Sequence, residues 1–140
     1  MTAAEALVAS LPRVSLVVGK GGVGKTTCAA ALALASSRTR ATVVLTTDAA
    51  PALPWVLQAD VGPDATPVGD RLHAQYIDAA RGRETFLGRH GEAIRAILDR
   101  GTYLDDEDIA PMIDSALPGG DEVFAAIELA ELLSGAPRFG

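Results

Sequence analysis

The sequence is poor in cysteine and contains no long apolar run. Its single cysteine, Cys28, rules out an internal disulfide and is typical of a protein that works in a reducing compartment. No stretch approaches the ~18 apolar residues that a transmembrane helix needs. The first ten residues lack the basic region of a signal peptide and are too short to be one. We therefore expect neither a secreted disulfide scaffold nor a membrane span, and we predict a cytoplasmic location.

Lysine is scarce too, and acidic residues outnumber basic ones. The formal net charge is −6, which argues against nonspecific binding to nucleic acid or to an anionic membrane. Only Lys20 and Lys25 are lysines, and every other basic residue is an arginine. Both lysines lie in one glycine-rich stretch, so that stretch is where the chemistry of the chain is concentrated.

This stretch matches a phosphate-binding pattern. Residues Gly19 to Thr26 fit G-x-x-x-x-G-K-[ST] without a mismatch. The preceding Val14–Val18 is predicted to be a buried strand, and Cys28–Ser36 to be a helix. A strand that enters a glycine loop and a helix that leaves it are the context that this motif requires. We therefore expect the chain to bind a nucleoside triphosphate, with Mg²⁺.

The residue types in the loop suit this ligand. Glycines can adopt positive φ and bring backbone N–H groups close to phosphate oxygens, and the helix that follows adds its own free N–H groups. Lys25 is expected to reach the β- and γ-phosphates, the Thr26 hydroxyl to bind Mg²⁺, and Thr27 to contact the α-phosphate. The predicted nucleotide-binding residues are Gly21, Gly22, Val23, Gly24, Lys25, Thr26 and Thr27.

The chain length allows one domain at most. Residues 1–60 are predicted to hold the glycine loop in a βαβ unit, whose second buried strand is Thr42–Thr46, and residues 70–135 to be mostly helical. Thr2 and Glu5 fit a capping box before a short N-terminal helix.

Further along, turn-forming residues predict irregular structure over Ala50–Gly69 apart from a turn at Trp55–Leu57, and Leu72–Ile77 is a candidate edge strand. Apolar spacing predicts a helix over Phe86–Leu98. Another helix is predicted after a cap at Asp121, with its buried face along Val123, Ile127 and Ala130.

The lysine at the second loop position narrows the choice of family. With Lys20, the loop resembles the deviant phosphate-binding loop of the MinD/ParA, nitrogenase-iron-protein and ArsA-type ATPases. This resemblance implies a homodimer joined through the nucleotide face, in which Lys20 reaches the nucleotide of the partner subunit and acts in catalysis. It also implies an α/β P-loop NTPase fold, with a parallel sheet flanked by helices.

The segment after the second strand points to one of these families. Thr46–Leu53 resembles the switch I segment of the ArsA-type ATPases, which commonly reads S-T-D-P-A-H/P-S-L. Asp48 then matches the catalytic aspartate that handles the attacking water. Ala49 departs from the pattern because the family has proline there, so a rigid turn is lost. Leu117–Phe124 looks like the P-G-x-D-E segment of the same family, and Leu72–Asp78 like its strand that ends in I-D.

The other families fit less well. A ParA or MinD partition ATPase would carry D-x-D-P-Q-like residues after the second strand, and an iron-protein reductase needs several cluster cysteines. Cys28 alone is instead expected to be a small apolar core residue.

The ArsA-type family continues with a strand that ends in D-T-A-P-T-G-H, and the sequence reaches Gly140 about where that strand should begin. In the family this strand lies between the two strands of the predicted βαβ unit, whose facing edges would otherwise be unpaired. We therefore expect the N-terminal part of a single ATPase domain. Its parent would have a metalloid or membrane-protein cargo. The alternative is a catalytically silent nucleotide-binding fragment.

Overall fold

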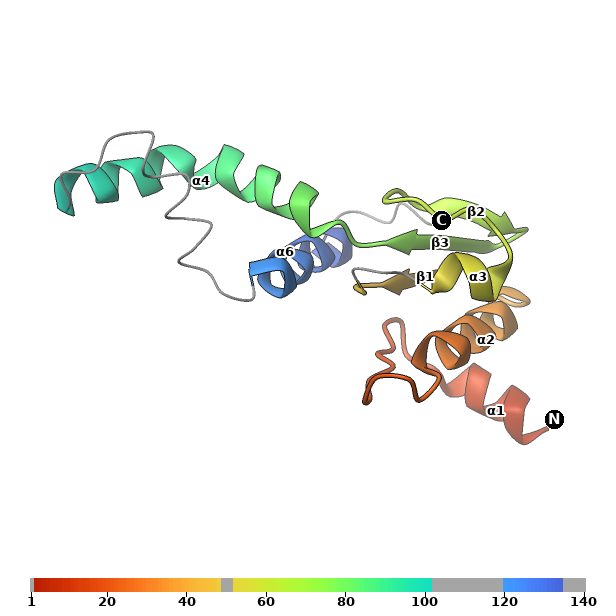
Figure 1. Cartoon of the computed structure of the whole chain (residues 1–140). Helices are drawn as coiled ribbons and strands as arrows, with labels where there is room; N and C mark the ends of the chain where they lie inside the picture. Colours follow the sequence, from red (N-terminus) through yellow and green to blue (C-terminus); the bar gives the residue numbers. More distant parts are fainter. Residues whose placement is uncertain (1, 49–51, 102–119, 135–140) are drawn as a thin grey trace. The chain divides into compact units, whose positions relative to one another are not determined.

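The computed structural model describes residues 2–48, 52–101 and 120–134 (Figure 1). The chain divides into two compact units. The first contains the described residues up to Ile77, and the second begins at Asp78. Among the described residues, no helix combines the length and the apolar character needed to cross a bilayer.

The first unit is a small α/β layer. Its helices are α1 (Ala3–Ser10), α2 (Lys25–Ser37) and α3 (Leu53–Leu57), and its strands are β1 (Thr42–Thr46), β2 (Thr66–Gly69) and β3 (Leu72–Tyr76). Helix α2 contacts β1, β3, α1 and α3 (Figure 1). The expected helix is confirmed and begins three residues earlier than predicted, while β1 has the predicted bounds.

The sheet has the order β1-β3-β2 and is mixed. Strand β3 runs parallel to β1 and antiparallel to β2, with an irregularity in the register between Pro67 and Gly69. Two expectations are corrected here. The Leu72–Ile77 segment supplies the central strand of the sheet and not an edge strand. The segment before it, expected to be irregular apart from a turn at Trp55–Leu57, contains β2, and α3 lies where that turn was expected. Proline is tolerated in β2 because β2 is an edge strand of the sheet.

The core of this unit lies between α2 and the sheet. Small side chains on α2 let the helix approach the strands closely, because each alanine adds only one methyl group between the two layers. The buried cluster consists of Ala30, Ala33, Val44, Leu53, Leu72 and Ala74.

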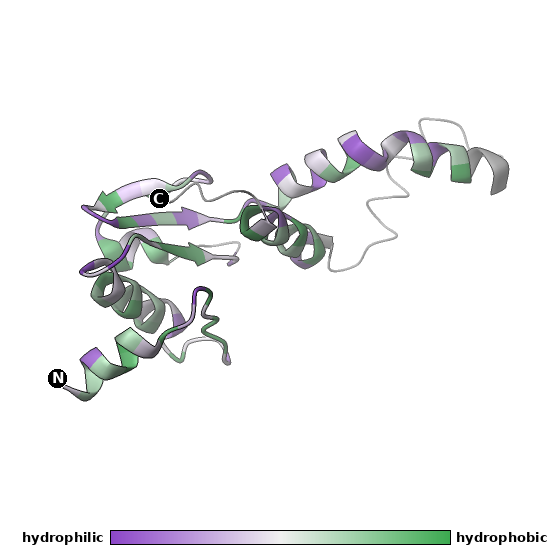
Figure 2. Ribbon diagram, turned by 180° about the vertical axis from the view of Figure 1, so that it is seen from behind, coloured by the Kyte–Doolittle hydropathy of each residue, from purple (hydrophilic) through white to green (hydrophobic). Residues whose placement is uncertain are grey.

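The predicted buried strand Val14–Val18 is wrong. This segment has no regular secondary structure and is exposed throughout, with Leu16 at 75% and Val18 at 83% of full exposure. Figure 2 shows the apolar character of the stretch that leads from α1 to α2. A strand forms only when neighbouring strands satisfy its backbone groups. Within the described part of the chain, β3 is the only strand that pairs with β1, so β1 keeps one free edge and the predicted βαβ unit has one strand.

Helix α1 begins as predicted. Thr2 and Glu5 form a capping box, in which the Thr2 N–H donates to Glu5 Oε2 (2.6 Å) and the Glu5 N–H donates to Thr2 Oγ1 (3.2 Å). Hydrogen bonds from the Thr2 backbone N–H and from the Thr2 side chain to the carboxylate lower the pKa of Glu5, with a smaller contribution from the charge of Arg38.

The second unit consists of α4 (Ala79–Gly101) and α6 (Gly120–Ser134), which pack against each other. The ring centroids of Phe86 and Phe124 lie 5.8 Å apart. Phe124 and Ala125 are buried in α6, whereas Val123 is 51% exposed. The predicted buried face of α6 is therefore wrong at Val123, and also at Ala130, which is exposed.

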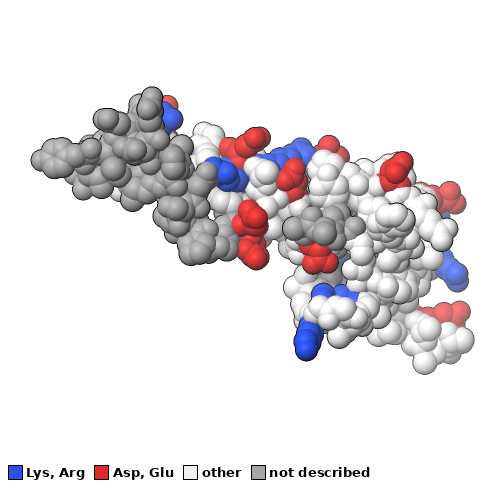
Figure 3. All heavy atoms as spheres, in the orientation of Figure 1, with Lys and Arg blue, Asp and Glu red and all other residues white. Residues whose placement is uncertain are grey.

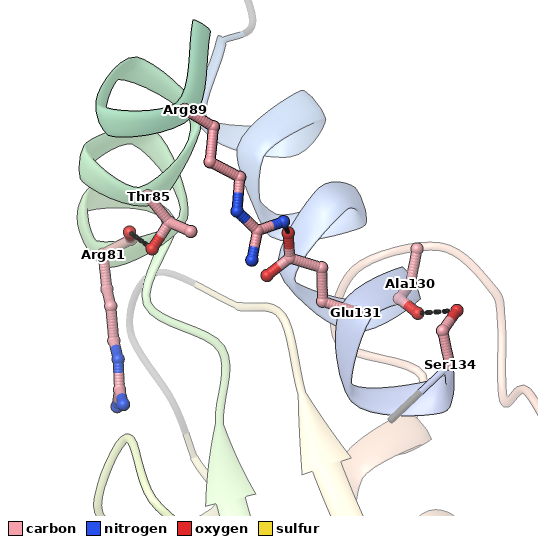
Figure 4. Close-up of polar contacts among 6 residues, drawn as sticks. All are labelled: Arg81, Thr85, Arg89, Ala130, Glu131 and Ser134. Carbon is pink, nitrogen blue, oxygen red and sulfur yellow. Dashed lines mark hydrogen bonds and ion pairs between the residues drawn. The ribbon is translucent and has the colours of Figure 1, made fainter. Parts of the chain in front are cut away.

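Polar contacts add to this helix pair. Arg89 of α4 forms an ion pair with Glu131 of α6, and both side chains are substantially exposed (Figure 4). The Thr85 and Ser134 hydroxyls each donate to the carbonyl oxygen four residues earlier in their own helix. The ion pair is exposed to solvent screening, so apolar packing contributes more to holding the two helices together.

Candidate functional site

Helix α2 begins directly after the glycine loop, and its N-terminus has no side-chain cap. Gly24 is the N-cap, and the first intrahelical hydrogen bond runs from the Cys28 N–H to the Gly24 oxygen (2.9 Å). The N–H groups of the first three helical residues, Lys25 to Thr27, therefore have no partner within the helix. Together with the positive end of the helix dipole they make an anion-binding position.

The loop backbone has the conformation that glycine permits. Gly22 has φ +77° and Gly24 has φ +88°, both in the left-handed region, as the sequence predicted. Gly21 was expected to share this property and does not. A Cβ placed on any of these three glycines would meet no other atom within 4 Å. The loop therefore presents an open surface on which a ligand can approach the backbone.

Lys25 lies across this loop. Its Nζ donates a hydrogen bond to the Lys20 carbonyl oxygen at 3.1 Å, so the ammonium group is held against the loop backbone. Lys20 itself is exposed, and Val23 of the same loop is 62% exposed. Basic atoms gather over this part of the surface (Figure 3). Both lysines are thus placed at the loop, with one charge folded onto it and the other facing solvent.

The other predicted loop residues lie on the first turn of α2. Thr26 is half-buried and Thr27 is exposed. Cys28 is exposed as well, which corrects its expected place in the core. In the structure, the first buried residue of α2 is Ala30.

Asp48 follows β1 and is exposed. Its backbone N–H donates to Thr46 Oγ1 at 3.3 Å. Strand β1 starts beside the C-terminal end of α2, where Thr42 Oγ1 donates to Ser36 Oγ (3.2 Å), and it runs back toward the N-terminus of that helix (Figure 1). The structure therefore places Asp48 at the same end of the unit as the glycine loop. Ala49, where the proline of the family pattern is missing, lies outside the described residues.

One polar side chain of the first unit was not identified from the sequence. Arg40, between α2 and β1, donates to the Ser36 hydroxyl and to two carbonyl oxygens at the end of α1. No pattern in the sequence identifies it, because its partners on α1 are backbone atoms.

The arrangement suits a phosphate ligand. Free N–H groups, an open glycine backbone and the Lys25 ammonium group meet at one loop, which also carries the exposed Lys20. A hydroxyl and a carboxylate lie at the same end of the sheet. The Thr26 hydroxyl and the triphosphate oxygens are hard oxygen ligands of the kind that Mg²⁺ prefers, so the residues present fit that ion.

Comparison with known proteins agrees with this chemistry. The profile of a family described as anion-transporting ATPase matches residues 12–138. A protein of Streptomyces coelicolor, described as uncharacterized, is 37% identical over 115 residues, which cover 79% of the chain. The match spans 28% of that relative, so the chain corresponds to little more than a quarter of its length.

Proposed function

Because the chain belongs to the family of anion-transporting ATPases of the ArsA type, we propose that it binds ATP and supports its Mg²⁺-dependent hydrolysis. The observation that carries this proposal is the uncapped N-terminus of α2. It directly follows an open glycine loop, and the Lys25 ammonium group is held against that loop. A triphosphate supplies the negative charge that these groups lack.

Each residue has a distinct role in this proposal. The backbone of Gly21 to Gly24 contacts the phosphates. Lys25 gives up its hydrogen bond to the Lys20 carbonyl oxygen and binds the β- and γ-phosphate oxygens instead. The Thr26 hydroxyl holds the Mg²⁺ ion, which neutralises phosphate charge when bound, and Thr27 contacts the α-phosphate. Asp48 orients the attacking water or accepts its proton.

Lys20 acts across a dimer. Its exposed side chain reaches the nucleotide of a second copy when two copies meet through their nucleotide faces. Comparable cationic groups supplied in trans raise turnover by ~10³–10⁵-fold. The parent protein would couple this cycle to a metalloid or membrane-protein cargo.

The two lysines provide a matched test. Titration of the intact chain with Mg·ATP by calorimetry should show binding, and Lys25→Ala should abolish it. Lys20→Ala removes the same charge five positions away, and we expect it to keep binding while losing nucleotide-dependent dimerisation and turnover. Equal loss of binding in the two variants would contradict the division of roles, and no binding by the unmodified protein would overturn the proposal.

Asp48 separates binding from hydrolysis. Asp48→Asn keeps the shape of the side chain and removes its charge, so Mg·ATP should still bind. Turnover should fall by ~10²–10⁴-fold if the carboxylate acts as a general base. Phosphate release measured at saturating ATP checks this. Unchanged turnover in the variant would show that the Asp48 carboxylate is not the general base.

A catalytically silent nucleotide-binding fragment is the second candidate, and the exposure of Val14–Val18 favours it. This segment leads directly into the loop and has no strand partner in the described part of the chain. A loop whose entry is not held in a sheet can bind phosphate but lacks the rigid positioning that catalysis needs. Binding of Mg·ATP without phosphate release by the unmodified chain would support this candidate.

A further inference from the structure

The chain leaves α1 and reaches the phosphate-binding loop through residues 12–18. One side chain, Arg40, fixes the end of α1 where this connection begins. Arg40 Nη1 and Nη2 each donate to the Leu11 carbonyl oxygen at 3.2 Å, and Nη2 also approaches the Val8 oxygen at 3.5 Å. These carbonyls end α1, which has no basic residue in its own last turn. The guanidinium group therefore supplies the cation and the donors that the helix C-terminus lacks.

The other side of Arg40 is fixed to a buried group. Its Nε donates to Ser36 Oγ at 2.8 Å, and Ser36 is only 3% exposed, near the end of α2. Thr42 Oγ1 donates to the same hydroxyl at 3.2 Å. The planar guanidinium group can hold several acceptors in a set geometry at once. Arg40 thus joins the end of α1 to the end of α2 and, through the Ser36 hydroxyl, to the start of β1.

This joint lies at one end of α2, and the glycine loop lies at the other. Thirteen residues of α2 span about 20 Å. Residues 12–18 connect Leu11 to the loop without regular secondary structure, and all of them are exposed. The hydrogen bonds from Arg40 to Leu11 therefore anchor the chain ahead of the loop.

We infer that Arg40 is a positioning residue for the phosphate-binding loop and acts by fixing the end of α1 to the C-terminal end of α2. The inference rests on the proposed nucleotide binding. Val14–Val18 has no strand partner in the described chain, so the hydrogen bonds at Leu11 take the place of sheet pairing in holding the chain ahead of Gly19. Helix α1 precedes the residues that the family profile matches, whereas Arg40 lies within them.

The expected effect is on affinity. Without the joint, only part of the population holds the loop in the binding conformation, and the apparent dissociation constant rises by the inverse of that fraction. Arg40→Gln should raise the Kd for Mg·ATP by about 3–10-fold. Saturating nucleotide selects the competent loop, so kcat should change less than twofold while KM rises with Kd.

The control is Arg71→Gln. Arg71 Nη1 donates to the Arg38 carbonyl oxygen at the same end of α2 (3.4 Å) and forms no hydrogen bond with the described residues of α1, so Kd should stay within error of the unmodified protein. Arg40→Lys keeps the charge but cannot span three acceptors, and an intermediate Kd is expected.

A double-mutant cycle separates positioning from general stability. Helix α1 contributes no buried residue, so removal of residues 1–11 leaves the core intact. This removal should raise Kd as Arg40→Gln does, and the two changes together should give no further increase. Additive effects, or a lowered melting temperature with unchanged Kd, would overturn the inference.

Hydrogen exchange gives a second readout if the shortened chain does not fold. Amides of residues 13–24 should exchange faster in Arg40→Gln than in Arg71→Gln, and equal exchange would overturn the inference. Failure of the unmodified protein to bind Mg·ATP would remove both the proposed function and this inference. Binding that Arg40→Gln leaves unchanged would remove only the inference.

Discussion

At the scale of single residues, the glycine loop depends on backbone conformations more than on side-chain contacts. Gly24 serves as the N-cap of α2 in the left-handed region, whereas Gly21 is not in that region, and both have open space around them. Any cost of adding a methyl group to either residue therefore comes from the backbone and not from a clash.

These two glycines make a matched pair. Gly24→Ala should lower the free energy of unfolding by about 1–2 kcal/mol, because a Cβ disfavours positive φ. Gly21→Ala should change it by less than about 0.5 kcal/mol. Urea unfolding measures both. Equal destabilisation by the two variants would show that the loop adopts another conformation in solution.

Glu5 shows how a single carboxylate contributes to local structure. Its pKa lies below the ordinary value because Thr2 donates hydrogen bonds to the charged form. A depressed carboxylate pKa means that the stabilising contribution is present above the unfolded pKa. That contribution is lost as the pH falls through the folded value.

We therefore expect the first turn of α1 to loosen on acidification. Carbon-13 NMR of the Glu5 carboxyl group should titrate below an ordinary glutamate, and Thr2→Ala should move the titration back toward the ordinary value by removing the Thr2 hydroxyl. An unshifted Glu5 in the unmodified protein would contradict the capping box. Asp64→Asn, in another part of the chain, should leave the Glu5 titration unchanged.

At the scale of elements, helices followed from the sequence better than strands did. Helix α2 and the capping box of α1 depend on hydrogen bonds between residues three or four positions apart, so local patterns predict them. Val14–Val18 has the composition of a strand but lacks a neighbour in the described chain, and composition cannot supply one. Strand β2 was missed because Pro67 is typical of a turn. Its place at the edge of the sheet depends on pairing with β3.

The buried face of α6 illustrates the same limit. Spacing along the helix favoured Val123, but the packing with α4 turns Phe124 toward Phe86. The contact depends on Gly82, where the two backbones come close. A Cβ at Gly82 would lie 2.6 Å from the Phe124 carbonyl oxygen, a distance that backbone atoms cannot relieve without moving a helix.

Gly82→Ala should therefore destabilise the second unit, by about 1–3 kcal/mol as for other overpacked sites. Gly91→Ala is the matched control in the same helix, because a Cβ there meets nothing within 4 Å. It should stabilise α4 by about 0.5–1 kcal/mol through helix propensity. Thermal unfolding followed by circular dichroism measures both variants, and similar shifts in the two would show that α4 and α6 are further apart in solution.

At the scale of the whole molecule, the residues of the candidate site could be predicted from the sequence, but the structure around them could not. The loop motif identified Gly22, Gly24 and Lys25 because phosphate binding requires those residue types at fixed spacing. The joint at Arg40 was not predictable, since its acceptors on α1 are carbonyl oxygens that every residue possesses. The exposure of the loop entry was not predictable either, because it depends on which strands are present to cover it.

That exposure has a consequence for the state of the chain in solution. Leu16 and Val18 lie in one short stretch of apolar surface, and such surface promotes association. We expect the nucleotide-free chain to self-associate as its concentration rises, and Leu16→Glu to reduce this.

Sedimentation velocity over a range of concentrations measures the association. Leu34→Glu places the same charge on an exposed leucine of α2, outside the Val14–Val18 stretch, and should have little effect. A chain that stays monomeric at every concentration, or an equal response to the two substitutions, would contradict the expectation.

The sole tryptophan, Trp55, is 85% exposed on α3. An indole in that setting emits as a fully hydrated fluorophore, so the chain carries a built-in optical probe a few residues beyond Asp48. Any subunit, cargo or chain segment that settles over α3 would dehydrate the ring and shift its emission to shorter wavelength. Occupancy of that surface can therefore be followed without attaching a label.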